Sequence, residues 1–292
     1  MTESSTAPVP LPTRAAAYHR PARLEQALEL LAAGPRTVLA GGTDLYPAAA
    51  GRPVRLEFLD VTAIEELRGI RVDGDAVTVG ATTTWTELAR APLPPAFRAL
   101  QAAARQVGAV QIQNAGTVAG NVCNASPAAD GVPPMLVLDA EVVLRSARGE
   151  RVLPLAGFLL GNRRTARQAD ELVTALRFPA LPARTRSAFL KLGHRSSLVI
   201  SIVMVAAAVE TGGDGAVRRA AVAVGACSPV ALRLPALERK LVGRRAGPDL
   251  AALAAPEDLA ALTPIDDLRG TAAYRREAAL VLVRRCLTEV LS

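Results

Sequence analysis

Two glycine turns carry the residue types that could bind a negatively charged group. The first is AGGTDL at residues 40–45, and the second is AGTVAGN at residues 115–121. Because glycine has no Cβ, several main-chain N–H groups of such a turn can approach one anion closely. A diphosphate is a good match for a pair of these turns. Neither turn reads GxGxxG ahead of a helix, so the dinucleotide-binding Rossmann fingerprint is absent.

The candidate donors in the two turns are of three kinds. Backbone N–H groups would come from Gly41, Gly42 and Thr43, a hydroxyl from Thr117 and a side-chain amide from Asn121. On the residues alone, ordinary tight turns at strand ends remain the alternative, since glycine turns are common throughout globular proteins.

The segment from Ile112 to Asp139 is unusually polar for a chain that is half hydrophobic. It holds three Asn, one Cys and three Pro before it ends in an apolar run. This composition favours irregular backbone with free amide groups, followed by a core strand. The Asn side chains could instead satisfy exposed backbone groups. Asp130 could bind a ribose hydroxyl or cap a turn, and both alternatives stay open.

Lys191 is one of only two lysines among 34 basic residues; the other is Lys240. It lies in the strand-like run SAFLKLG, where side chains alternate between the two faces. A solvent-facing strand residue is the ordinary interpretation. The retention of a lysine in an arginine-rich chain points mildly to a specific role.

No constellation for nucleophilic or metal-dependent catalysis is evident. His194 has no acidic neighbour within six positions, and no serine or cysteine lies in a GxSxG setting. The three cysteines are far apart and form no CxxC pair, and the only histidines are His19 and His194. We therefore expect no catalytic side chain and no metal site, and the sparse cysteines fit a reducing compartment.

Length and composition bound the fold class. The chain has 292 residues, of which 50% are hydrophobic and 3% aromatic, so two or three subdomains with Ala, Leu and Val cores are expected.

The net charge of +7 comes from scattered arginines, and no basic helix carries interleaved aromatic residues, which argues against nucleic-acid binding. No apolar run reaches the roughly 18 residues of a membrane span, and residues 1–21 lack the continuous apolar core expected of a signal peptide. We expect a cytoplasmic protein.

Helix and strand signals alternate in the first half of the chain. The expected helices begin at Leu24, at Thr84 as a cap and at Pro95. The expected strands occupy 37–40, 56–61, 69–72, 76–81, the run MLVLDAEVVLRS at 135–146, the run RVLPL at 151–155 and 171–178.

A proline-rich stretch near residues 179–183 marks the expected domain boundary. Beyond it the patterns predict strands at 187–193, 200–211 and 217–225, with a hairpin turn at 212–215. Helices are expected at 231–242, 247–254 and 271–290. The chain then divides into a flexible lead at 1–16, a domain at 17–180 that splits near residue 65, and a C-terminal domain at 181–292.

These motifs together resemble one protein family. AGGTDL, LDVTAIEELRGI, VTVGATTTWTEL, IQNAGTVAGNVCNASPAADGVPP, FLKLGHRSSLVISIV and VGACSPVALR are similar to the FAD-binding medium subunit of molybdenum hydroxylases, which include xanthine and carbon monoxide dehydrogenases. The resemblance is collinear over roughly residues 18–290. It implies an α+β fold, with a two-subdomain FAD-binding domain of the p-cresol methylhydroxylase/vanillyl-alcohol oxidase type. A C-terminal domain with a three-stranded antiparallel sheet and helices is implied to follow.

The resemblance also implies a set of contacts to non-covalently bound FAD. The two turns would hold the diphosphate, Asn124 would contact the flavin, Asp130 the sugar portion and Lys191 the isoalloxazine, with Gly80 nearby. The implied cofactor-binding residues are Ala40, Gly41, Gly42, Thr43, Asp44, Leu45, Gly80, Thr117, Ala119, Gly120, Asn121, Asn124, Asp130 and Lys191.

Ala119 departs from the family pattern, whose second turn usually reads TIGG. Alanine keeps the backbone N–H but adds a methyl group and loses easy access to positive φ. The substitution thus places the second turn's fit to FAD in question.

The implied activity is that of an electron-transferring oxidoreductase subunit. In such complexes a small subunit carries two [2Fe–2S] clusters and a large subunit carries molybdopterin, and electrons pass through FAD to NAD, a quinone or another acceptor. The expected assembly is a dimer of heterotrimers. A self-contained FAD-dependent oxidase or dehydrogenase with the same cofactor fold is the alternative.

Overall fold

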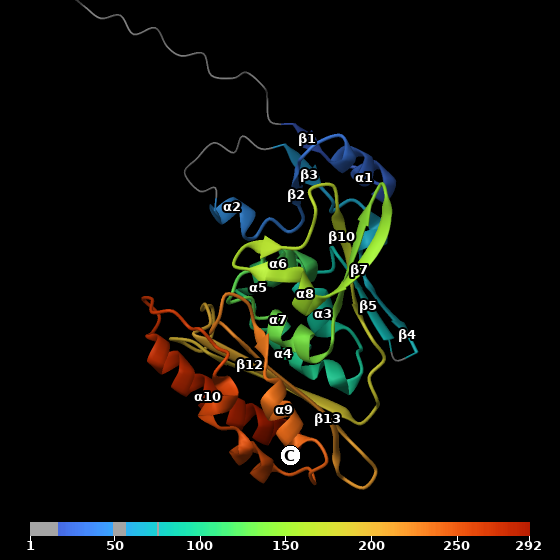
Figure 1. The fold of residues 1–292 in the computed structure, drawn as a ribbon. Coiled ribbons are helices and arrows are strands. Elements are labelled where there is room, and N and C mark those ends of the chain that lie inside the picture. Colours follow the sequence, from blue (N-terminus) through green and yellow to red (C-terminus); the bar gives the residue numbers. More distant parts are fainter. Residues whose placement is uncertain (1–16, 49–56, 75) are drawn as a thin grey trace, which may run out of the picture.

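A computed structural model of the chain describes residues 17–48, 57–74 and 76–292. The expected lead at 1–16 lies outside these ranges, as do Leu56 of one expected strand and Asp75 of one expected turn. Figure 1 shows three regions that follow one another from top to bottom: a small parallel sheet with α1, a central antiparallel sheet with short helices, and a C-terminal sheet with α9 and α10.

The first region is built on the amphipathic helix α1 (Leu24–Ala32). Its four apolar positions, Leu24, Ala27, Leu28 and Leu31, are buried against a parallel sheet of order β1-β3-β2. The strands are β1 (Tyr18–His19), β2 (Thr37–Leu39) and β3 (Phe58–Asp60), and the short helices are α2 (Leu45–Ala48) and η1 (Glu65–Leu67). The sequence predicted α1, β2 and β3 of this unit but not β1, α2 or η1, which are too short to produce a periodic signal.

The second region is a five-stranded sheet of order β4-β5-β10-β6-β7, in which every neighbouring pair is antiparallel. The strands are β4 (Ile70–Asp73), β5 (Ala76–Gly80), β6 (Glu141–Ser146), β7 (Gly149–Pro154) and β10 (Leu172–Phe178). β5 and β6 flank the late strand β10, so residues 81–140 form one long excursion between two strands that are not neighbours. That excursion carries the second glycine turn.

Short helices make up this excursion and the return to β10. They are α3 (Trp85–Arg90), η2 (Pro95–Phe97), α4 (Arg98–Ala104), α5 (Val110–Ala115), α6 (Val118–Asn124) and α7 (Val132–Val137), followed by α8 (Leu155–Phe158) and the hairpin of β8 (Leu159–Gly161) and β9 (Arg164–Thr165). The predicted cap at Thr84 is a full capping box, in which Thr84 and Glu87 bond each other's backbone N–H.

Two predictions for this excursion were wrong. The stretch 112–139 is largely helical rather than irregular, and the strand expected from Met135 begins only at Glu141, after α7. Pro133 and Pro134 lie in the first turn of α7, where their fixed φ suits a helix and their missing N–H costs nothing. All six residues of α7 are buried, so its apolar run lacks the periodicity that separates a helix from a strand.

The third region has a four-stranded antiparallel sheet between two helical layers. The strands are β11 (Thr185–Leu192), β12 (Val203–Thr211), β13 (Val217–Gly225) and the two-residue β14 (Leu232–Arg233). The helices are α9 (Pro235–Leu241), η3 (Pro248–Leu253), η4 (Pro256–Leu259) and α10 (Ala272–Leu291). The three long strands and their hairpin were predicted. The helix expected at 247–254 is a 3₁₀ helix.

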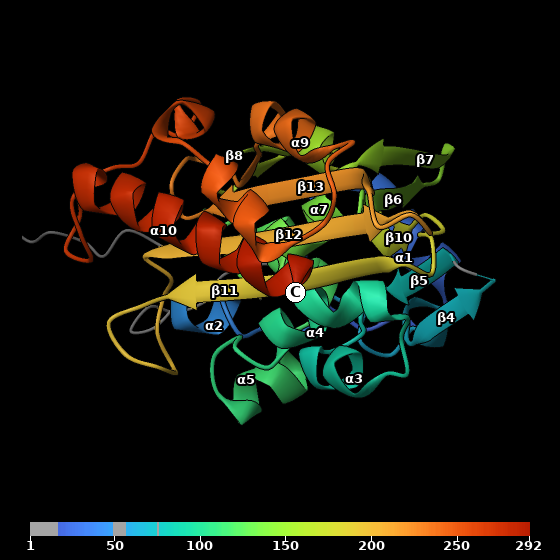
Figure 2. The same cartoon turned by 90° about the horizontal axis from the view of Figure 1, so that it is seen from below.

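Both faces of this sheet are buried, which joins the third region to the second. Along β12, Val203, Val205 and Ala207 pack with α9 and α10, whereas Met204 and Ala206 pack in the same core as the second region. Figure 2 shows α9 and α10 on the near side of β11, β12 and β13, with α4 and α7 among the elements beyond. Over the three described ranges, no helix is both long and apolar enough to cross a membrane.

Candidate cofactor site

The two glycine turns lie against each other in the structure. A Cβ on Gly41 would overlap the carbonyl oxygen of Ala115 and lie 2.9 Å from the Cα of Gly116. The absence of a side chain therefore lets the 40–45 turn pack directly on the backbone that leads into α6. Gly42 has φ +67°, a left-handed conformation that favours glycine. In Figure 1, β2 and α2 lie directly above α5 and α6.

A cavity of about 720 Å³ opens at this junction, within the size range of ligand pockets. All the expected cofactor-binding residues line it except Gly80, Asp130 and Lys191. The expected residues that do line it are Ala40, Gly41, Gly42, Thr43, Asp44, Leu45, Thr117, Ala119, Gly120, Asn121 and Asn124. The sequence thus predicted two walls of one cavity from turns that are more than 70 residues apart.

Several main-chain N–H groups in this lining have no acceptor among the described residues, and those of Gly41, Gly42, Thr43 and Ala119 are among them. Buried backbone donors are nearly always paired, so a cluster of free donors on a cavity wall suits an acceptor supplied by a ligand. The first turn has free donors because β2 ends at Leu39 and its ladder stops there.

The side chains of the second turn also leave polar atoms for a ligand. Asn121 Oδ1 is buried without a hydrogen-bond partner among the described residues. Thr117 caps α6, because its Oγ1 accepts a hydrogen bond of 3.0 Å from Gly120 N–H, and its own hydroxyl proton stays available. These orphaned groups and the free amides fit the diphosphate and polar edges of FAD.

Ala119 does not strain the second turn. It is the second residue of α6 and has no positive φ, and its side chain is 3% exposed in the core. Its side chain packs in the core of the second region, whereas its N–H is one of the free donors of the lining. The backbone at this position therefore needs no glycine, because it is helical.

We expect Ala119→Gly to leave FAD affinity within about twofold of the parent, because the main-chain donor is unchanged. The same change should lower the free energy of unfolding by about 1 kcal/mol, through the flexible backbone and the lost buried methyl group. Urea denaturation and FAD titration of the two proteins measure both quantities. A clear gain in FAD affinity would contradict this account of the turn.

Asp130 and Lys191 form a buried ion pair behind the cavity wall. Lys191 Nζ lies 2.6 Å from Asp130 Oδ2, and the two side chains are 7% and 9% exposed. Ser201 Oγ donates a hydrogen bond to the other carboxylate oxygen. Burial raises the pKa of Asp130, whereas Lys191 and Ser201 act to lower it. The solvent-facing alternative for Lys191 is therefore wrong. The Asp130 carboxylate accepts no backbone hydrogen bond among the described residues, and Asp130 is not part of the cavity lining.

This ion pair ties the second region to the third. Asp130 lies between α6 and α7, whereas Lys191 is on β11 and Ser201 just precedes β12. The pair is close to the cavity, because Lys191 Nζ also lies 3.5 Å from the carbonyl oxygen of Gln106, whose neighbour Val107 lines the cavity. No local sequence signal could reveal the pair, since its two members are 61 positions apart.

Several lining residues were missed by the sequence analysis. Arg36, Arg167 and the free thiol of Cys123 contribute to the wall, and Trp85, Val107, Gly108, Ile112 and Ile200 also line the cavity. Arg36 and Arg167 bring positive charge to it. Scattered arginines in an arginine-rich chain gave no signal that these two were special.

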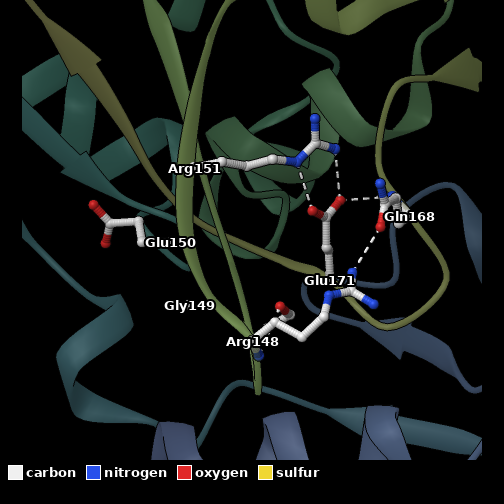
Figure 3. Close-up of a pocket in the computed structure, with 7 residues that line it drawn as sticks. Arg148, Gly149, Glu150, Arg151, Gln168 and Glu171 are labelled. Atoms are coloured by element: carbon white, nitrogen blue, oxygen red, sulfur yellow. Dashed lines mark hydrogen bonds and ion pairs between the residues drawn. The ribbon is translucent and has the colours of Figure 1, made fainter.

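A second, smaller cavity of about 410 Å³ lies at the hairpin of β6 and β7 (Figure 3). Arg151 makes two bonds to Glu171, at 2.6 and 2.8 Å, and Arg148 donates to the side chain of Gln168. The bonds from Arg151 hold the pKa of Glu171 below its usual range. These polar groups satisfy one another's hydrogen-bonding capacity. We therefore interpret the network as an anchor for the loop that carries Arg167 and not as a ligand site.

Comparison with known proteins decides the family. Residues 13–181 match the family model of the FAD binding domain in molybdopterin dehydrogenase, and residues 188–290 match that of the CO dehydrogenase flavoprotein C-terminal domain. This chain belongs to the FAD-binding subunits of the molybdopterin dehydrogenases. The expected α+β fold, the oxidoreductase class and FAD as the cofactor are thereby confirmed.

Individual relatives of this flavoprotein subunit support the assignment. The nicotinate dehydrogenase FAD-subunit of Eubacterium barkeri is 37% identical over 234 residues, which cover 77% of this chain and 79% of that protein. The carbon monoxide dehydrogenase medium chain of Hydrogenophaga pseudoflava is 31% identical over 274 residues, with 92% and 95% covered. A solved carbon monoxide dehydrogenase from the same organism superposes with a TM-score of 0.85 at 32% identity, covering 95% of this chain and 97% of that one.

Proposed function

We propose that this flavoprotein subunit is the electron-transferring component of a molybdenum hydroxylase complex. Bound FAD would accept electrons from the [2Fe–2S] clusters of a partner subunit and pass them to NAD, a quinone or another acceptor. The observation that supports this most is the cluster of free main-chain N–H groups, those of Gly41, Gly42, Thr43 and Ala119 among them, on a cavity of about 720 Å³ in a chain of an FAD-binding family.

The chain's own residues would bind and orient the cofactor. We propose that Gly41, Gly42, Thr43 and Ala119 donate backbone N–H groups to the diphosphate, and that Thr117 donates its hydroxyl. Such fixed donors bind an anion without the entropy cost of ordering long side chains. The remaining expected turn residues, Ala40, Asp44, Leu45, Gly120 and Asn121, complete the two walls, and Asn124 is a polar contact for the flavin.

Three expected residues would act from behind the wall. Gly80 directly precedes the lining residue Ala81, and a Cβ at Gly80 would approach the backbone of Leu67. Asp130 and Lys191 join the flavin domain to the C-terminal domain, which we place on either side of residues 180 and 181. The positive charge of Lys191 near the isoalloxazine end would favour electron density on the reduced ring.

The partners follow from the assembly that this function requires. We propose a small subunit with [2Fe–2S] clusters and a large subunit with molybdopterin, arranged as a dimer of heterotrimers. The relatives of this chain include medium chains and lettered subunits of multi-subunit dehydrogenases, such as carbon monoxide and caffeine dehydrogenase. Substrate would be oxidised on the large subunit, so this chain needs no proton-transferring side chain.

The visible absorption spectrum of the purified chain tests the proposal. We expect a flavin spectrum, about one FAD per chain on release, and bleaching by NADH or a quinol under anaerobic conditions. Purification of the native complex should recover iron and molybdenum in partner subunits. A colourless chain that takes up no added FAD would overturn the flavin assignment. A yellow chain that oxidises a substrate without any partner would instead favour a self-contained flavoenzyme.

A further inference from the structure

Arg163 reaches the rim of the cofactor cavity from the turn between β8 and β9. Its backbone has φ +57°, and its N–H donates a 2.9 Å hydrogen bond to the carbonyl oxygen of Ala125. Ala125 is the residue that ends α6 and is itself left-handed, with φ +47°. The turn is therefore docked on the end of α6, and this contact sets where the Arg163 side chain points.

The guanidinium of Arg163 joins the two walls of the cavity. Nη1 lies 2.5 Å from Asp44 Oδ2 and Nη2 lies 3.5 Å from Asp44 Oδ1, whereas Nη1 also donates to Asn124 Oδ1. Asp44 belongs to the first glycine turn and Asn124 to the last turn of α6. Arg163 is 119 positions from Asp44, so three distant segments meet in this one contact.

Asp44 is the only acidic residue among the described residues that line the cavity. An uncompensated carboxylate at this rim would repel a diphosphate, which is itself negatively charged. Arg163 removes that repulsion by pairing with it. Both side chains are about half exposed, at 54% and 50%, so the effect is screened by salt.

We propose that Arg163 is a positioning residue that neutralises Asp44 and so lets the anionic cofactor enter the cavity. This inference rests on the proposed FAD site. It assigns to Arg163 no contact with the cofactor: the residue acts through the charge of Asp44 and through the bond to Asn124. Its main effect is therefore on the affinity for FAD.

FAD titration of the cofactor-stripped chain tests this role in four proteins: the parent, Arg163→Ala, Asp44→Asn and the double variant. We expect Arg163→Ala to raise the Kd for FAD about three- to tenfold at low ionic strength, and less at high salt. Asp44→Asn should bind at least as tightly as the parent. The double variant should recover most of the lost affinity, because the carboxylate that Arg163 neutralises is gone.

Arg164→Ala is the matched control, because Arg164 follows directly at the start of β9, is exposed, and its side chain makes no hydrogen bond or ion pair with any residue that the structure describes. It should match the parent. An Arg163→Ala variant that binds like Arg164→Ala would overturn the inference, and so would a double variant as weak as Arg163→Ala. A parent chain that binds no FAD would instead overturn the proposed function, so the two failures are distinguishable.

Discussion

Replacing Gly41 with alanine should lower the affinity for FAD by about 10- to 100-fold, because the new methyl group overlaps backbone rather than a movable side chain. The added Cβ would meet the carbonyl oxygen of Ala115 and lie 2.6 Å from its carbonyl carbon. The first turn must then move away from the backbone that leads into α6. The free N–H groups of Gly41 and Ala119, which we propose bind one diphosphate, would then be moved apart.

Gly157→Ala is the control for this prediction. Gly157 lies in α8, and a Cβ added there meets nothing within 4 Å. FAD titration and urea denaturation of both variants separate lost binding from lost folding. We expect Gly41→Ala to retain the far-ultraviolet circular dichroism of the parent while binding FAD poorly. Unchanged FAD affinity in a folded Gly41→Ala protein would show that the contact between the two turns does not shape the site.

Replacing Lys191 with methionine should lower the free energy of unfolding by about 3–5 kcal/mol near neutral pH, because it leaves the Asp130 carboxylate buried without its counter-charge. Both side chains are less than one-tenth exposed, so water cannot take the place of the ammonium group. Ser201 would be the remaining hydrogen-bond donor to the carboxylate among the described residues. Urea denaturation measures the loss.

The loss should depend on pH in a defined direction. Burial already raises the pKa of Asp130, and removing Lys191 takes away the largest opposing effect. An acid whose folded-state pKa is raised destabilises the fold above that pKa, and protonation relieves the penalty as pH falls. Lys191→Met should therefore cost more stability at about pH 8 than at about pH 5.

The double variant Asp130→Asn/Lys191→Met provides the control for the buried pair. With no buried charge left, it should regain most of the stability and lose the pH dependence of the single variant. A single variant whose stability loss is the same at both pH values would contradict the prediction. So would a double variant that is as unstable as Lys191→Met.

Much of the fold could be predicted because its signals are local. The apolar spacing of α1, the Thr84 capping box and the hairpin between β12 and β13 each depend on residues within a few positions of one another. α7 was mistaken for a strand for the opposite reason. It is buried on every side, so the contrast between apolar and polar faces that identifies a helix is missing.

The sequence by itself determined the chemistry that the site can offer: two glycine turns with free amides, an amide and a hydroxyl beside them, and the family that uses them. Those features are properties of the backbone and of single residues. Only the tertiary structure decided how they act together. Gly41 is needed because Ala115 approaches it, Asp130 is paired because Lys191 reaches it from β11, and Asp44 is neutralised because the β8–β9 turn brings Arg163 to it. Each of these contacts joins segments that are far apart along the chain. A local sequence pattern cannot predict which distant segments meet in the folded protein.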